Sequence, residues 1–395
     1  MDGMDYIPRA VEALLGRQLD RGKSVLLLGP RQTGKTTLLS RYPAQLVVSF
    51  VRPDVRLRYE RTPGQLVGEI EALAPPRRGR RPLVVLDEIQ RVPALLDAVQ
   101  HAIDAGLAQF VLTGSSARRL RRGGAVNLLP GRLVTLRLDP LSLSEFPSLP
   151  LEVRLLDGSL PAISRVQDPA DRERDLRSYV ESYLEEEVRA EALVRNVGSF
   201  ARFLELAGLE AGGIVSFRGL AQELGIAHTT IATYYEILED CLVAERIDPL
   251  TRSRTRKKLT KSSRWLLFDM GVRRLCANEG RRVPRERLGQ LFEQMIALEL
   301  VRLIRLEDVS MKLLFWRDPD GPEVDWIVDR EGTLIPIESK LTDMPTARDV
   351  RHVEVFLREY KEADRGYLVC RAPRRVRLSD RVTAVPWQDL AAVVA

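Results

Sequence analysis

The residues best suited to chemistry lie between Ser24 and Leu39, which read SVLLLGPRQTGKTTLL. The spacing G-x-x-x-x-G-K-[ST] of a phosphate-binding loop runs from Gly29 to Thr36. Its glycines let backbone N–H groups converge on phosphates, its lysine would reach the β- and γ-phosphates, and its threonine would hold Mg²⁺. The predicted ATP-binding residues are Gly29, Pro30, Arg31, Gln32, Thr33, Gly34, Lys35, Thr36 and Thr37.

The segments around this loop predict the elements that would hold it. Val25 to Leu28 form an apolar run typical of a buried strand, and Leu38 and Leu39 follow with helical spacing. A chance match in a glycine-containing turn is the alternative, but it would rarely have a buried strand before it and an apolar helix after it. Strand, loop and helix are the context that the motif requires.

A second acidic motif follows an apolar run at residues 83–88, LVVLDE. Asp87 would bind Mg²⁺ through its water shell, and Glu88 would polarise the attacking water; a strand-terminating turn is the alternative. The next short strand, residues 110–112, would end beside the phosphate loop in a parallel sheet. Ser115 is the first candidate there to sense the γ-phosphate, and Thr113 is the second.

Arg132 follows a Pro-Gly turn and precedes another strand-like stretch, residues 133–138. A multimeric ATPase needs an arginine that neutralises charge on a neighbouring subunit's nucleotide. Arg132 is the predicted supplier, which implies a homo-oligomer, whereas a surface arginine without such a role is the alternative.

Residues 198–247 predict a helix-turn-helix, with helices at 217–225 and 231–242 and a possible wing from Val243. A basic stretch, TRSRTRKKLTKSSR, continues from Thr251 to Arg264. Clustered cations on one hairpin are the expected footprint of phosphate contacts, so DNA is the predicted partner. A winged helix used for protein contact is the alternative. The predicted DNA-binding residues are His228, Thr229, Thr230, Arg252, Arg254, Arg256, Lys257, Lys258 and Lys261.

The last quarter contains a second candidate active site. Strands are predicted at residues 323–328 and 334–340, and alternation places Glu338 and Lys340 on one face of their strand. Asp325 would join Glu338 in holding Mg²⁺, and Lys340 would activate water or stabilise a pentavalent phosphate. Glu293, on a helix at 288–303, would add or orient a ligand. The arrangement D…E-x-K resembles that of restriction-endonuclease-like nucleases; loss of activity with retention of shape is the alternative.

The composition of the chain limits the classes of protein to which it can belong. The chain has 395 residues, a length typical of proteins with several domains, and a net charge of +6. Its 45% hydrophobic and 29% charged residues are typical of globular proteins. Only three cysteines and three histidines occur, without a C-x-x-C pair, so neither a disulfide framework nor a zinc site is expected. No apolar run approaches a membrane span and no secretory signal precedes the first helix, so a cytoplasmic location without a membrane partner is expected.

Taken together, GPRQTGKT, LVVLDEIQ, LTGSSA, LPGR and DPLSLSEF resemble the AAA+ superfamily, and in particular prokaryotic predicted ATPases with a C-terminal domain of uncharacterised function. The resemblance covers essentially the whole chain. It implies an α/β fold with a P-loop AAA+ parallel sheet, a helical lid and ATP hydrolysis between subunits. The expected domains are an AAA+ core (1–149), the lid (150–195), a winged helix (196–265) and a small α/β restriction-endonuclease-like domain (266–395).

These features predict a Mg²⁺-dependent ATPase that uses ATP to change conformation on nucleic acid, with DNA cleavage at the C-terminal site. Two other functions stay open. One is a nucleotide-dependent switch or scaffold that binds a protein partner through an inactive nuclease-like domain, and the other is an ATP-driven transcriptional regulator. Salt-dependent DNA binding separates the first of these from the leading prediction, because phosphate contacts give affinity a steep salt dependence.

Overall fold

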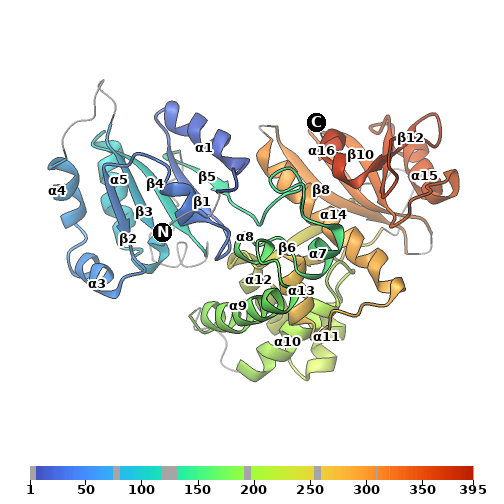
Figure 1. The fold of residues 1–395 in the computed structure, drawn as a ribbon, viewed down its shortest axis with the longest axis horizontal. Helices are drawn as coiled ribbons and strands as arrows, with labels where there is room; N and C mark the ends of the chain where they lie inside the picture. Colours follow the sequence, from blue (N-terminus) through green and yellow to red (C-terminus); the bar gives the residue numbers. More distant parts are fainter. Residues whose placement is uncertain are drawn as a thin grey trace. The chain divides into compact units, whose positions relative to one another are not determined.

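The computed structural model describes residues 6–73, 81–116, 131–190, 197–252, 259–307, 309–319 and 321–394. Contacts divide the chain into two compact units. The first comprises Met1–Leu141 with Ile237–Val243, and the second comprises Ser142–Glu236 with Ala244–Ala395. Figure 1 shows both units as a ribbon and labels many of their helices and strands.

The first unit is built on a parallel sheet of five strands, which confirms the predicted α/β class with a parallel sheet. The strands are β1 (Ser24–Leu28), β2 (Leu46–Ser49), β3 (Leu83–Asp87), β4 (Gln109–Gly114) and β5 (Leu133–Arg137), in the spatial order β2-β3-β4-β1-β5. Because β4 lies between β1 and β3, the carboxyl end of β4 separates the phosphate-loop strand from the strand that ends in Asp87.

Helices cover this sheet, which explains the continuous apolar runs of its central strands. They are α1 (Val11–Asp20), α2 (Lys35–Leu39), α3 (Pro53–Arg61), α4 (Gln65–Glu71) and α5 (Leu95–Asp104), with a 3₁₀ turn at Ile89–Arg91. Sequence reasoning missed α3. Tyr59 is its one buried residue, so the helix has no apolar periodicity to reveal it.

The second unit begins with helices: α7 (Leu151–Leu156), α8 (Pro161–Ser164), α9 (Pro169–Ala190), α10 (Val197–Leu209), α11 (Phe217–Leu224), α12 (His228–Asp240) and α13 (Met270–Cys276). From Ile237 onward, α12 is grouped with the first unit. The residues of the expected lid form α7, α8 and α9, and they are grouped with the second unit.

An eight-stranded mixed sheet forms the rest of this unit, in the order β12-β13-β11-β10-β9-β8-β6-β7. Its strands are β6 (Ala244–Pro249), β7 (Arg264–Leu267), β8 (Met311–Arg317), β9 (Glu323–Arg330), β10 (Thr333–Ser339), β11 (Gly366–Cys370), β12 (Val376–Arg377) and β13 (Val382–Pro386). The hairpin β6–β7 joins β8 through a parallel pairing of Asp248 with Leu314, so the sheet runs across the expected boundary at residue 265.

Two hydrophobic clusters cover the faces of this sheet. Helix α14 (Arg285–Leu306) contributes Phe292 and Ile296 to the cluster that contains Trp326, and α15 (Arg351–Glu359) contributes Phe356 to the cluster that contains Trp316. Short segments at Ala347–Val350, Trp387–Asp389 and Ala391–Val394 complete the unit. The clusters fix β9 and β10, which carry Asp325 and Glu338.

Candidate functional site

The loop from Gly29 to Thr36 joins buried β1 to α2 and folds back on itself. Gly34 has φ +94°, a conformation that favours glycine, and a Cβ on Gly29 would collide with the backbone oxygen of Leu138. The Lys35 ammonium, 5% exposed, donates to the backbone oxygens of Gly29 at 2.7 Å and Pro30 at 2.9 Å. The lysine therefore lies inside the curl of backbone that the motif predicts.

The Asp87 carboxylate lies at the end of β3, where three hydroxyl groups surround it. Thr113 Oγ1 donates to Oδ1 at 2.7 Å, and Ser49 Oγ donates to Oδ2 at 3.1 Å. The Thr36 hydroxyl lies 3.3 Å from Oδ2. The two predicted Mg²⁺ groups, Thr36 and Asp87, are thus brought together, and their oxygens fit the preference of Mg²⁺ for hydroxyl and carboxylate ligands.

Glu88 adopts a left-handed backbone conformation, with φ +59°, directly after β3. Ser115 Oγ donates to Glu88 Oε2 at 3.2 Å, and the Gln90 amide donates both to Ser115 Oγ, at 3.0 Å, and to the same carboxylate. Lys35 Nζ lies 4.0 Å from Glu88 Oε1. The Ser115 hydroxyl therefore contacts Glu88, the residue predicted to polarise the attacking water. The role of Ser115 in sensing the γ-phosphate stays a prediction.

Two side chains at this site have contacts that sequence reasoning missed. Thr113 is the second candidate for sensing phosphate. Its hydroxyl donates to the Asp87 carboxylate and accepts a hydrogen bond from the backbone N–H of Glu88 at 2.9 Å. Buried Arg9 donates to the Thr33 oxygen and to the Asp139 oxygen, each at 2.6 Å, and so fixes the loop. No motif marks Arg9, because arginine is abundant throughout the chain.

Arg132 makes a two-bond ion pair with Asp104, at 2.6 Å from Nε to Oδ1 and 3.0 Å from Nη2 to Oδ2. Both side chains are more than a third exposed, so the pair lies at the surface. The predicted action of Arg132 on a neighbouring subunit stays a prediction.

Helices α11 and α12 lie where the sequence predicts the two helices of a helix-turn-helix, and a winged-helix domain stays a prediction. Ser216 caps α11 by accepting from the Gly219 N–H at 3.2 Å, and Gly225 ends it at φ +65°. Tyr235 of α12 packs against the rings of Phe203 and Trp265. His228 and Thr229 are exposed at the start of α12 and Thr230 is half-buried. Their contact with DNA stays a prediction.

The predicted cations divide into described and undescribed residues. Arg252 is exposed and pairs with Asp329 at 3.3 Å, and Lys261 is exposed. Arg254, Arg256, Lys257 and Lys258 lie outside the described residues. Helix α12 itself contains neither lysine nor arginine, and it ends in acidic residues. The predicted cations of this region therefore lie in the segment between β6 and β7, and α11 adds the exposed Arg218.

Asp325 and Glu338 lie on the adjacent strands β9 and β10, and each is 7% exposed. Asp325 Oδ2 accepts from the Ser339 N–H at 2.8 Å. Burial, with the nearby charges of Glu293 and Glu338, raises the pKa of Asp325 well above its usual value. Burial also raises the pKa of Glu338 to about 7, while Lys340, 3.5 Å away, opposes that rise.

The chemistry of this pair fits a cation. Glu338 Oε2 is buried and has no hydrogen-bond partner, and two buried carboxylates with raised pKa values are stabilised by a nearby positive charge. Across the residues that the structure describes, no group of three or more His, Cys, Asp or Glu side chains could hold a metal ion. A cation here would therefore have Asp325 and Glu338 as its two carboxylate ligands.

Glu293 is held by an arginine that sequence reasoning assigned only to the basic stretch. Arg264 Nη1, on β7, lies 2.6 Å from Glu293 Oε1. Its guanidinium lies over the rings of Phe315 and Trp326, at 4.8 and 5.0 Å from the centroids. Arg264 is 4% exposed. The pairing of β6 with β8 brings it to Glu293, and no spacing in the sequence reveals that pairing.

Three family models match the chain. One, described as an AAA domain, matches residues 21–147, and two, described as domains of unknown function (DUF8612 and DUF4143), match residues 150–281 and 288–390. This result supports an AAA-type ATPase and agrees with the predicted resemblance for the first part of the chain.

Two bacterial relatives are similar to this chain over most of its length. An uncharacterised protein of Mycobacterium tuberculosis is 28% identical over 390 residues, covering 97% of this chain and 84% of the relative. One from Haemophilus influenzae is 23% identical over 341 residues, covering 79% of this chain and 81% of the relative.

Two solved structures are also similar. The Bacillus subtilis DNA clamp loader delta protein is 12% identical, with TM-score 0.26, over 58% of this chain and 88% of that chain. The Pif1 helicase from Candida albicans is 16% identical, with TM-score 0.24, over 45% of this chain and 48% of that chain. The match therefore spans about half of the helicase. Within the described residues, no helix is both long enough and apolar enough to cross a membrane.

Proposed function

We propose that this protein is a Mg²⁺-dependent AAA+ ATPase that couples ATP hydrolysis to conformational change on DNA. The observation that carries this proposal is the convergence of Lys35, Thr36, Asp87 and Glu88 around the carboxyl ends of β1 and β3. The AAA-domain match over the same residues supports it.

The roles of these residues follow from their positions. Lys35, now on the loop carbonyls, turns to the β- and γ-phosphates and neutralises part of their charge. Thr36 and Asp87 supply oxygens to Mg²⁺, which when bound offsets charge on the phosphates. Thr113 and Ser49 orient the Asp87 carboxylate through their hydroxyls. Glu88 accepts a proton from the attacking water, with Ser115 and Gln90 fixing its carboxylate.

The DNA part of the proposal is supported by the basic stretch between β6 and β7. Arg252 and Lys261 at its two ends are exposed. Removing one cation that binds a phosphate should reduce the slope of log affinity against log salt by about 1. Titrating a DNA duplex at several salt concentrations, with Lys261→Gln and with Lys312→Gln on β8 as control, measures this. An unchanged slope in Lys261→Gln would remove that residue from the interface.

We further propose that Asp325, Glu338 and Lys340 cleave a phosphodiester bond. The orphaned oxygen of Glu338 beside Asp325 supports a bound cation, and Lys340, 3.5 Å from Glu338, would stabilise the phosphate that gains charge. Asp325→Asn and Lys340→Ala should each abolish DNA cutting on a gel while ATP turnover in the same tube stays at the wild-type rate. Cutting that persists in both variants would exclude this centre.

A second candidate function is a nucleotide-dependent scaffold that binds a protein partner and cuts nothing. Two observations favour it. The ion pair with Arg264 occupies Glu293, which is then less available to a metal ion. The acidic residues at the end of α12 repel the phosphates of a nucleic acid. ATP turnover that is indifferent to DNA, with no cutting, is the result that this candidate predicts.

A further inference from the structure

The second unit contains a pocket of about 560 Å³ at one edge of its sheet. Strands β10, β11 and β13 run parallel to one another. Leu341 follows β10, Arg371 follows β11 and Trp387 follows β13, and all three line the pocket. The pocket therefore lies at the carboxyl ends of three parallel strands, the edge where α/β sheets generally bind their ligands.

The lining combines an apolar wall with charges of both signs. Trp387, which is 8% exposed, lies with leucine and valine side chains from α7, α14 and the segment before α14. Arg371 and Asp343 form an ion pair of 3.1 Å and are 45% and 60% exposed, so their charges remain accessible to solvent. Arg281 and Glu152 complete the charged part of the lining. The volume falls within the usual range of small-ligand sites.

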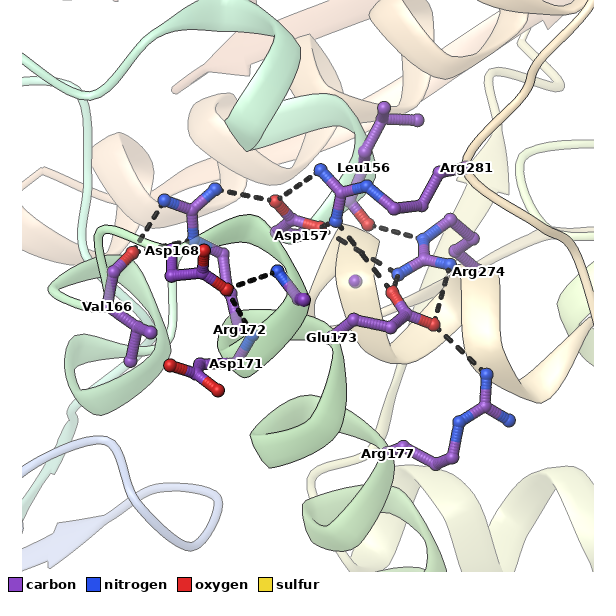
Figure 2. A network of polar contacts seen from close by, with 12 residues as sticks. Leu156, Asp157, Val166, Asp168, Asp171, Arg172, Glu173, Arg177, Arg274 and Arg281 are labelled. Carbon is purple, nitrogen blue, oxygen red and sulfur yellow. Dashed lines mark hydrogen bonds and ion pairs between the residues drawn. The ribbon is translucent and has the colours of Figure 1, made fainter.

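Arg281 is fixed by a buried network, which Figure 2 shows from close by. Its two terminal nitrogens donate to the fully buried carboxylate of Asp157, at 2.5 and 3.1 Å. Arg172 donates to the same carboxylate at 2.9 Å, and Arg274 pairs with Glu173 on α9. The buried Asp157 carboxylate thus fixes the position of Arg281 in the pocket lining.

Arginines outnumber carboxylates among the ion pairs of this network, and the Glu152 carboxylate of the pocket lining adds a negative charge near Arg281. The two carboxylates of Asp157 and Glu173 are shared among four arginines, Arg172, Arg177, Arg274 and Arg281. Only Arg281 of the four lines the pocket. The Arg281 side chain is 33% exposed and Arg371 is 45% exposed, so an anionic group in the pocket can contact both guanidinium groups.

We propose that this pocket binds a nucleotide unit, with its base against Trp387 and the leucines and its phosphate between Arg281 and Arg371. A nucleotide carries the groups that the lining matches: a flat base, an anion, and a base N–H that donates to Asp343 or Glu152. The pocket lies wholly in the second unit, and the proposal is independent of ATP hydrolysis at Lys35. The unit is either a free nucleotide or the terminal nucleotide of a strand. Leu341 directly follows Lys340, so a strand end held here would lie next to the end of β10.

The test uses the full chain with Lys35→Ala, so that the phosphate loop does not contribute. Calorimetric titration in EDTA uses two probes, thymidine 5′-monophosphate and a short 5′-phosphorylated oligothymidylate. Arg371→Gln should weaken binding about tenfold, as expected for the loss of one charge-assisted hydrogen bond. Arg377→Gln, an exposed arginine of the same sheet paired with Asp380, should leave binding unchanged.

Each outcome decides the proposal. Binding of the mononucleotide identifies a free nucleotide as the ligand, and binding of the oligonucleotide alone identifies a strand end; either must be weakened by Arg371→Gln and by Leu341→Trp, which fills the pocket. The proposal is overturned if neither probe binds, or if Arg371→Gln and Arg377→Gln behave alike.

Discussion

At the scale of single residues, the motif positions act through partners that the motif does not name. Asp87 is oriented by Thr113 and Ser49, and Glu88 by Ser115 and Gln90. Burial makes these contacts strong, since Thr113 and Ser115 are fully buried and have little water to compete for their hydroxyls. The arrangement of carboxylates at this site therefore depends on residues from β2 and β4.

Thr113→Val tests this dependence with almost no change in volume. The Asp87 carboxylate loses its 2.7 Å hydrogen bond, so we expect kcat for ATP to fall about tenfold while nucleotide affinity changes little. Steady-state phosphate release and nucleotide titration give the two quantities. Thr135→Val, at an exposed position on β5, is the matched control. A kcat equal to that of the control would show that Thr113 does not position Asp87.

Glu338 predicts a pH dependence of stability. Burial raises its pKa to about 7, so the folded protein retains a proton that the unfolded chain, with a pKa near 4.5, has lost. The resulting stability is fully present below the unfolded pKa and is lost as pH rises through about 7, at roughly 1.4 kcal/mol per pH unit for one proton. Thermal unfolding in EDTA should show this decline.

Glu338→Gln cannot lose a proton, and we expect its stability to fall less than that of the wild type between about pH 5 and pH 8. Glu362→Gln, at an exposed carboxylate outside the groups that shift the pKa of Glu338, is the control and should keep the wild-type slope. Equal slopes in the wild type and Glu338→Gln would contradict a buried, proton-holding Glu338.

At the scale of elements, α13 is anchored by a buried carboxylate and a glycine. Asp269 accepts from the N–H groups of Gly271 and Val272, at 2.9 and 3.2 Å, and from Ser159 N–H at 2.7 Å. Gly158 has φ +77°, and a Cβ there would collide with the Asp269 carboxylate. The turn between α7 and α8 and the start of α13 therefore require glycine at this position.

Gly158→Ala should destabilise the protein by roughly 2 to 4 kcal/mol, since it combines backbone strain with a collision. Gly225→Ala is the matched control, because Gly225 also has a positive φ, +65°, but no atom lies within 4 Å of an added Cβ. We expect it to cost only about 1 kcal/mol. Denaturant unfolding measures both; equal losses of stability would mean that the collision with Asp269 has no energetic weight.

Helices and strands with a local apolar pattern could be predicted from the sequence, whereas those without one could not. β1, β3 and β9 have apolar runs or alternation that reveal them, and the phosphate loop follows from local spacing alone. α3 has one buried residue and so lacks a pattern, and the joining of β6 to β8 depends on partners about 65 residues apart. Arg264 reaches Glu293 through such a distant pairing, and Arg9 reaches the Thr33 oxygen from 24 residues away, so no local spacing marks either arginine.

At the scale of the whole molecule, we propose ATP chemistry in the first unit and ligand binding with strand cleavage in the second. The AAA-domain match covers only the first of these. Subunit association is the feature that would complete the ATP site, through Arg132, and it can be tested without knowledge of the assembly's size.

Mixing two inactive variants tests action between subunits. Lys35→Ala retains Arg132, and Arg132→Ala retains the phosphate loop, so a mixed assembly would contain some complete sites. We expect each variant alone to be inactive and the mixture to recover part of the wild-type ATP turnover. Asp104→Ala removes the surface partner of Arg132 and should stay active. A mixture as inactive as its components would contradict action in trans.

Phosphate release from ATP by the purified protein with Mg²⁺, compared among wild type, Lys35→Ala and Lys23→Ala, tests directly whether the protein is an ATPase centred on Lys35. Lys23 is exposed just before β1, whereas Lys35 lies within the phosphate loop. We expect turnover in the wild type and Lys23→Ala and its loss in Lys35→Ala. Equal turnover in all three proteins would contradict an ATPase centred on Lys35.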